Sequence, residues 1–176
     1  MAKPIITHQQ LLELLHYDPL TGIFTWKIAR GNVRAGATAG TDNGTGYLVA
    51  KVLGRMYRLN RLAWFYVHGQ WPAMVVDHQD EDKQNNRLAN LRDVSHSTNR
   101  QNISRASARS TSGLLGGQVP RRGRPRSQIR IGGKAISLGT FATPEEASAA
   151  HMNAKRQLHP GYVEKEGPPG FLPAGL

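Results

Sequence analysis

Asp77 and His78 stand next to each other in the middle of the chain, and Asn99 follows a short distance further along. An aspartate carboxylate and an asparagine carbonyl are hard oxygen donors that suit Mg²⁺ or Mn²⁺, ions that keep coordination positions for water and a substrate phosphate. A histidine beside such an ion can act as the general base that deprotonates an attacking water. The chain has no cysteine, so any metal must rest on His, Asp, Glu or Asn. These residue types predict a hydrolytic site that holds one divalent metal ion.

The local sequence predicts a strand, a loop, a second strand and a helix around these residues. The run 75–78 begins with two β-branched residues and ends in the Asp-His pair, and 91–94 is typical of a returning strand. Ser95 is a favourable N-cap for a helix that would carry Asn99 on its second turn. Such an arrangement would gather the three candidate side chains at one point.

Several segments of this region resemble the HNH motif of phage homing endonucleases. The motif itself is carried by Asp77-His78, by the Asn-Asn-Arg-Leu-Ala-Asn-Leu-Arg segment at 85–92 and by the segment 95–99. Upstream stretches are also similar to these enzymes, and the resemblance covers roughly residues 7 to 102; these stretches are 17–26, 57–64 and 69–72.

The resemblance implies a ββα-metal finger, also called a His-Me finger, with a role for each matching position. His78 would be the general base, and Asp77 and Asn99 would bind one Mg²⁺ or Mn²⁺ ion. Asn90 matches the middle asparagine of the motif, which secures the loop of the finger and helps to orient the base. The catalytic candidates are therefore His78 and Asn90.

Two positions depart from the family pattern. Asn60 stands where members of the family usually have His, and Glu81 stands where they usually have Gly, in the turn after Asp-His. The missing His would matter if it supports the site. The missing Gly would matter if the backbone there needs a positive φ.

The residues before the motif predict a small α/β extension. A capping-box pattern at Thr7 opens a helix over about residues 8–16, and turn residues separate this helix from a strand at 23–27. A hairpin around Gly54-Arg55 follows, and then a helix that stops at Gly69.

The residues after the motif predict a second small unit. Residues 128–141 alternate polar and apolar side chains across Gly132-Gly133, which predicts an antiparallel hairpin, and Thr143 then caps a helix that ends near Leu158. The expected product is a three-stranded sheet with one helix. The segment 138–147 is similar to the APETALA-type DNA-binding domain, which implies a sheet that enters the major groove. The residues expected to contact DNA here are Arg122, Arg124, Arg126, Gln128, Arg130 and Lys134.

The charge of the chain points to a polyanionic partner. Lys and Arg number 23 against 12 Asp and Glu, a formal net charge of +11, and no acidic residue occurs between Asp93 and Glu145. We expect double-stranded DNA, with its flanking phosphates held by Arg87, Arg92 and Arg100. No apolar run is long enough to cross a bilayer and the first residues lack the pattern of a signal peptide, so we expect no membrane partner and a cytoplasmic site of action in a bacterial host cell.

We therefore expect an α+β protein that hydrolyses a DNA phosphodiester bond with a single metal ion, with a monomer favoured. The non-enzymatic alternative is a sequence-specific DNA-binding protein or a decayed endonuclease, which Asn60 favours. An RNA-binding or ribosome-associated protein is a third interpretation that the charge alone permits. The expected segments are an N-terminal α/β extension (1–56), a ββα-metal finger (57–104), a basic linker (105–117), an APETALA-type domain (118–158) and a disordered tail (159–176).

Overall fold

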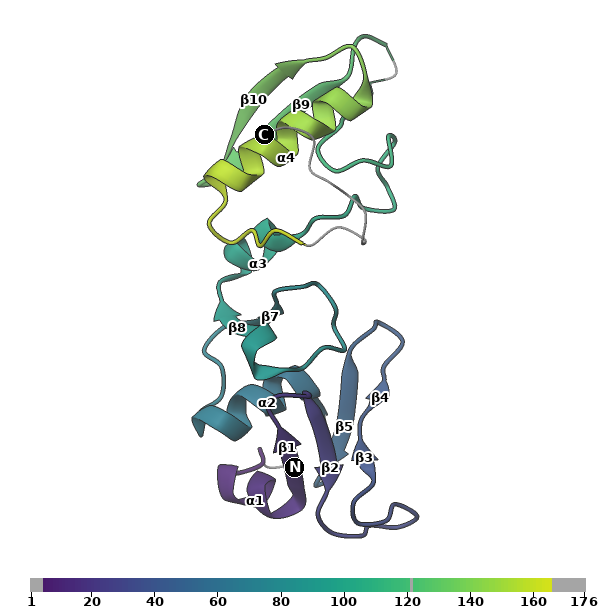
Figure 1. The fold of residues 1–176 in the computed structure, drawn as a ribbon, viewed down its shortest axis with the longest axis vertical. Coiled ribbons are helices and arrows are strands. Elements are labelled where there is room, and N and C mark those ends of the chain that lie inside the picture. Colours follow the sequence, from purple (N-terminus) through teal and green to yellow (C-terminus); the bar gives the residue numbers. More distant parts are fainter. Residues whose placement is uncertain (1–4, 121, 166–176) are drawn as a thin grey trace. The chain divides into compact units, whose positions relative to one another are not determined.

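A computed structural model describes residues 5–120 and 122–165 of the protein, and the chain divides into two compact units, Met1–His96 and Ser97–Leu176. Both units combine short helices with small antiparallel sheets, which confirms the predicted α+β class (Figure 1). Within the described residues, no helix is both long enough and apolar enough to span a bilayer.

The first unit opens with a helix that leads directly into a strand. In α1 (His8–Leu14), Thr7 Oγ1 accepts from the amide of Gln10 while the Gln10 side chain accepts from the amide of Thr7, so the predicted capping box is present. The predicted end of this helix at residue 16 is wrong. Residues 15 and 16 already pair with β2 (Ile23–Trp26) as part of β1 (Leu15–Asp18), because the intervening turn closes a hairpin there.

Two three-stranded sheets and a second helix complete the framework of this unit. The first sheet has the order β1-β2-β3, with β3 at Thr38–Ala39, and the second has the order β4-β5-β6. The predicted hairpin is present, but its turn is Leu53-Gly54 instead of Gly54-Arg55, because Arg55 already pairs with Val52 as the first residue of β6. The helix after it ends at Gly69, whose φ of 68° is the left-handed cap expected there. The elements are β4 (Thr41–Asp42), β5 (Leu48–Val52), β6 (Arg55–Arg58) and α2 (Leu59–His68).

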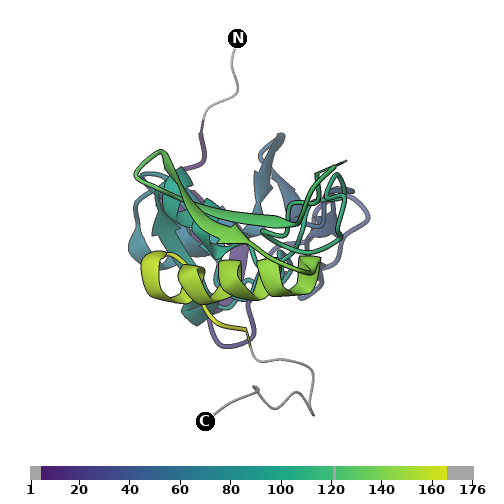
Figure 2. The ribbon, with the colours of Figure 1, turned by 90° about the horizontal axis from the view of Figure 1, so that it is seen from above.

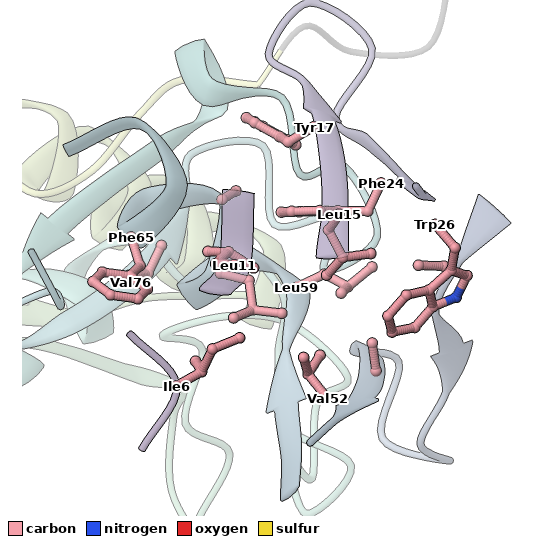
Figure 3. Packing of buried hydrophobic residues seen from close by; sticks show 14 of the residues in the cluster. Ile6, Leu11, Leu15, Tyr17, Phe24, Trp26, Val52, Leu59, Phe65 and Val76 are labelled. Carbon is pink, nitrogen blue, oxygen red and sulfur yellow. The ribbon is translucent and has the colours of Figure 1, made fainter. Parts of the chain in front are cut away.

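One hydrophobic core joins the N-terminal extension to the region of the motif. Leu11, Leu15, Phe24 and Leu62 are fully buried in it, and Val76 of the motif strand belongs to the same cluster (Figure 3). The predicted boundary at residues 56 and 57 therefore does not separate two cores. Burial of these apolar side chains is the main force that holds the motif strand against the extension.

The predicted strand, loop, strand and helix follow in the expected order. Here β7 (Val75–His78) pairs antiparallel with β8 (Leu91–Val94), and the short 3₁₀ turn η1 (Leu88–Asn90) precedes β8. The helix α3 (His96–Asn102) begins directly after Ser95. The boundary between the two units falls at the start of this helix, so that Asn99 belongs to the second unit.

The second unit is built on a hairpin with a helix along one side, as Figures 1 and 2 show. The hairpin strands are β9 (Arg126–Ile131) and β10 (Lys134–Thr140), and α4 (Pro144–Leu158) starts after Thr143, whose hydroxyl accepts from the amide of Glu146. These predicted elements are confirmed.

The predicted third strand of this sheet is wrong for the described residues. Only an isolated bridge between Gln118 and Arg126 adds to β9 on its open edge. Further along that edge, His151 Nδ1 lies 3.0 Å from the carbonyl oxygen of Gln128, and His159 Nε2 lies 3.0 Å from that of Arg130. Two imidazoles of the α4 region thus contact backbone carbonyls of β9 that a third strand would otherwise pair with.

Two segments expected to lack structure contact the rest of the second unit. Ser148 Oγ of α4 donates to the carbonyl of Leu115, inside the predicted linker. After α4, the amide of Gly161 donates to Gln101 Oε1 and the amide of Val163 to Asn102 Oδ1, so residues 159–165 pack on α3. For these residues the prediction of a disordered tail is wrong, and its remainder, 166–176, lies outside the described residues.

The turn after β1 lets two distant segments approach closely, which can be tested at Gly22. Its φ is +75°, and a Cβ there would lie 2.5 Å from the amide nitrogen of Arg87 and 2.6 Å from the carbonyl carbon of Asn86. Gly36 is the matched control, because its φ is +83° but no atom lies within 4 Å of its Cβ position. Gly22→Ala should therefore lower the free energy of unfolding by about 1–3 kcal/mol more than Gly36→Ala, the usual range for overpacking. Urea denaturation of both variants measures this difference, and equal losses would contradict the close approach.

Candidate active site

The strand β7 delivers Asp77 and His78 into the interior of the first unit. Asp77 is 7% exposed and His78 is 3% exposed, and the preceding Val76 is 4% exposed. Asn60 of α2 lies behind the strand and donates from Nδ2 to the carbonyl oxygen of Val76 at 3.0 Å. The position where the family usually has His is thus filled by a side chain that hydrogen-bonds the backbone of the motif strand.

The imidazole of His78 is held by an asparagine that sequence reasoning missed. Its Nε2 lies 3.1 Å from Asn86 Oδ1, and Asn86 Nδ2 donates to the carbonyl of Gln84. This second bond orients the amide so that its oxygen faces the imidazole. Nε2 is therefore the protonated ring nitrogen, and the lone pair that a base needs is on Nδ1.

The surroundings of His78 keep its imidazole neutral. Burial lowers the pKa of His78, and this effect outweighs the opposing influence of the Asn86 hydrogen bond and of the carboxylates of Asp80, Asp77 and Asp82. At neutral pH the side chain is therefore ready to accept a proton, which is what a general base requires.

Asn86 is itself held by a residue far from it in the sequence, Tyr17 of β1. It is 1% exposed, and its carbonyl oxygen accepts a 2.7 Å hydrogen bond from the buried hydroxyl of Tyr17. Burial, and secondarily the charge of Asp18, raises the pKa of Tyr17 to about 12, so the hydroxyl stays a donor. The sequence signal for Asn86 was the Asn-Asn doublet at 85–86, which does not say which amide turns inward.

Asn90 closes the loop between the two strands. Its Nδ2 donates to Asp80 Oδ1 at 2.9 Å and to the carbonyl of Asn85 at 2.8 Å, while its Oδ1 accepts from the amide of Asp80. Asn85 Nδ2 also donates to Asp80 Oδ2. Burial raises the pKa of the Asp80 carboxyl, but the bonds from Asn85, Asn90 and the amide of Asp82 together hold this pKa below its usual value. The carboxylate is thus an internal acceptor around which the loop folds.

Asp77 and Arg92, predicted as a metal ligand and a phosphate contact, are paired with each other. They face each other across the hairpin, and Arg92 Nε and Nη2 lie 2.9 and 2.8 Å from Asp77 Oδ2. The guanidinium therefore engages the carboxylate that a metal ion would use.

The Asp77 carboxylate nevertheless suits a hard divalent ion. Magnesium accepts such oxygen donors and often keeps only one or two protein ligands and several waters. Among residues 5–120 and 122–165, no group of three or more His, Asp or Glu side chains is arranged to hold a metal. The other predicted ligand, Asn99, lies in the second unit.

The predicted DNA contacts on the hairpin of the second unit lie on two different faces. Arg126, Gln128 and Arg130 alternate with buried residues on β9, so their exposed side chains share one face. Lys134 pairs with Ile131 and therefore belongs to the opposite face, which separates it from the others. The remaining predicted contacts are exposed, and they are Arg87 in the motif loop, Arg100 on α3, and Arg122 and Arg124 ahead of β9.

The site thus combines a buried imidazole, held by Asn86 of the loop between β7 and β8, with the neighbouring carboxylate of Asp77, held by Arg92 of β8, and hydrolases use these residue types. Residues 57–101 match the family model of the HNH endonucleases. The matched segment is a nuclease domain, and the chain is a phosphodiester hydrolase whose substrate is DNA. No curated protein and no solved structure matches the chain.

Glu81, the second departure from the family pattern, has a backbone conformation in the motif loop that can be tested by substitution. Glu81 has a φ of 66°, a left-handed conformation that costs a residue with a side chain about 1–2 kcal/mol. Glu81→Gly should therefore raise the free energy of unfolding by up to about 1 kcal/mol after the extra entropy of glycine in the unfolded chain is subtracted. Glu81→Ala is the control, because it removes the carboxylate but keeps the Cβ. A thermal or urea melt in which Ala stabilises as much as Gly would assign the effect to charge instead of backbone strain.

Proposed function

We propose that this protein is a metal-dependent DNA endonuclease of the homing type and of phage origin, with His78 as its general base. The observation that carries the proposal is the imidazole itself, which is buried, neutral and oriented by Asn86 inside the HNH-matching segment. The β7-β8 hairpin followed by α3 has the element order of a ββα-metal finger, which supports that architecture.

In the proposed reaction, His78 Nδ1 accepts a proton from the water that attacks the phosphorus atom. The Asn86 hydrogen bond on Nε2 holds the ring in the correct tautomer and stabilises the imidazolium that forms. Asn90 contributes by positioning, since it holds the loop around Asp80 and thereby the backbone that carries Asn86.

We assign Asp77 and Asn99 as the protein ligands of one Mg²⁺ or Mn²⁺ ion. When bound, such an ion supplies positive charge that stabilises the developing charge on the phosphate and on the departing 3′ oxygen. The ion pair of Asp77 with Arg92 holds the carboxylate in place and also competes for it. Arg92 would have to share Asp77 with the ion or turn toward a phosphate.

We further propose that the second unit is an APETALA-type DNA-binding domain that reads or holds the duplex through the β9 face. Arg126, Gln128 and Arg130 project from alternate positions of one strand. Paired across from them on β10 are Thr140, Ser137 and Ala135, whose small side chains leave the longer ones standing out.

The rival function, a non-catalytic DNA-binding protein or decayed endonuclease, was favoured by Asn60. In the folded chain Asn60 donates a hydrogen bond to the carbonyl of Val76 on the strand that carries Asp77, so this position supports the motif strand. Cleavage of a plasmid that requires an added divalent metal ion separates the two functions, because a decayed enzyme binds without cutting.

The assignment of the base predicts a separation of cleavage from binding. His78→Ala should lower the cleavage rate by about 10²- to 10⁴-fold, the usual contribution of a general base, and leave the affinity for DNA nearly unchanged. His16→Ala is the matched control, because His16 is exposed on β1. Plasmid nicking and fluorescence anisotropy measure the two quantities, and a His78→Ala protein that folds and cuts at the normal rate would exclude this mechanism.

The proposed role of the β9 face predicts a change in salt dependence. The double variant Arg126→Gln, Arg130→Gln should reduce the slope of log affinity against log salt by about 0.9 for each phosphate that the protein no longer neutralises. Lys134→Gln removes one positive charge from the opposite face of the same hairpin and should leave the slope unchanged. Anisotropy titrations of these proteins over a salt series test this, and a slope that Lys134→Gln lowers equally would show that only net charge matters.

A further inference from the structure

Two cations of the first unit lie on one aromatic ring beside His78. The Arg58 guanidinium carbon lies 4.2 Å from the centre of the Tyr47 ring, and Lys83 Nζ lies 4.9 Å from the same centre. The Tyr47 and His78 ring centres are 6.0 Å apart. One phenol ring thus carries both cations and lies close to the imidazole.

These cations come from different parts of the chain and are held in place. Arg58 ends β6, and Lys83 lies in the loop between β7 and β8, where its Nζ donates to the carbonyl of Thr45 at 2.8 Å. Both residues are exposed. Stacking on Tyr47 and the bond to Thr45 reduce the freedom that such long side chains would lose on binding a ligand.

The charge of the two side chains is not balanced by a carboxylate in direct contact. Within the described part of the chain, the ion pairs join Arg92 to Asp77 and Arg156 to Glu164, and neither Arg58 nor Lys83 takes part in one. Two exposed positive charges held against one ring attract an anion. The arrangement is therefore complementary to a phosphate.

Arg58 also connects this place to a basic groove along β6. The groove has a volume of about 560 Å³, and it is lined by Arg55, Arg58 and Arg61 together with Tyr57 and Trp71 and the apolar Ile5 and Met56. Trp71 stacks on Phe65 and Tyr57, with ring centres 4.2 and 5.6 Å away, which makes the aromatic wall rigid. Its described lining contains basic and apolar residues and no acidic one.

From these contacts we infer that Arg58 and Lys83, stacked on Tyr47, bind the DNA phosphate next to the one that is cut, and that the same strand continues along the basic groove. The inference rests on the proposed function, because it takes the position of the cut from His78. The Tyr47 ring, which both cations contact, lies 6.0 Å from the His78 ring, so the inference places the phosphate that they hold beside the reacting one.

This position makes Arg58 and Lys83 residues for binding and not for the chemical step. Arg58→Gln and Lys83→Gln should each lower the slope of log affinity against log salt, by up to about 0.9 because the two residues share one phosphate, and should weaken binding to a mixed-sequence duplex. Cleavage at saturating protein should keep the wild-type rate, so that KM rises while kcat does not. Arg58→Lys, which keeps the charge, should restore the slope and serves as a check on folding.

The chain offers matched controls for both variants. The Arg30 guanidinium carbon lies 4.1 Å from the centre of the Trp26 ring, as Arg58 lies on Tyr47, and Lys27 Nζ donates to the carbonyl of Leu12, as Lys83 donates to that of Thr45. Arg30→Gln and Lys27→Gln should leave the slope unchanged. Anisotropy measured without divalent metal on all five proteins and the wild type gives the slopes, and single-turnover cleavage with metal gives the rates.

Each result of these measurements has one meaning. Unchanged slopes in Arg58→Gln and Lys83→Gln, or equal losses in the two controls, would overturn the phosphate site. Tighter binding of duplex RNA than of duplex DNA, lost in the same variants, would overturn the assignment of the strand to DNA. Failure of the proposed function is distinguishable, because His78→Ala would then cut normally while the metal-free binding slopes still report on Arg58 and Lys83.

Discussion

The buried amide of Asn86 is the contact on which the arrangement of the first unit depends. Its side chain orients His78, and its backbone carbonyl accepts from the hydroxyl of Tyr17. A buried polar group without a partner costs about 1–3 kcal/mol, so three groups that satisfy one another inside the protein specify a single arrangement. The extension is therefore part of the candidate site, because it supplies the donor that fixes the loop.

The loop between β7 and β8 is held by polar side chains in place of an apolar core of its own. Asp80 accepts from Asn85, Asn90 and the amide of Asp82, and Glu81 takes a left-handed backbone conformation in the same turn. Backbone strain next to a reactive side chain persists only where the surroundings determine the conformation more strongly than the strain opposes it. Here the hydrogen bonds around Asp80 fix the turn that contains Glu81 in its left-handed conformation.

The second unit contains a short sheet in which one edge of β9 is largely unpaired by another strand. Unpaired edge carbonyls invite pairing with another chain, and in this unit imidazoles from the α4 region cover two of them on β9. This cover leaves the face of β9 that carries Arg126, Gln128 and Arg130 exposed. Edge protection and the proposed contact with DNA thus use different sides of the same strand.

Local patterns in the sequence determined most of the secondary structure and placed the Asp77-His78 pair at the end of a strand. The capping box at Thr7, the alternation in β9 and the β-branched run before Asp77 act over a few residues, and the elements they predict are present. Contacts between distant residues required the folded chain. These contacts join residues whose spacing in the sequence follows no local period. They are the bond between Asn86 and His78, the ion pair of Arg92 with Asp77, and the stacking of Arg58 and Lys83 on Tyr47. Local periodicity says which face of an element is buried, but only the packing of one core around those faces decides which polar side chains meet there.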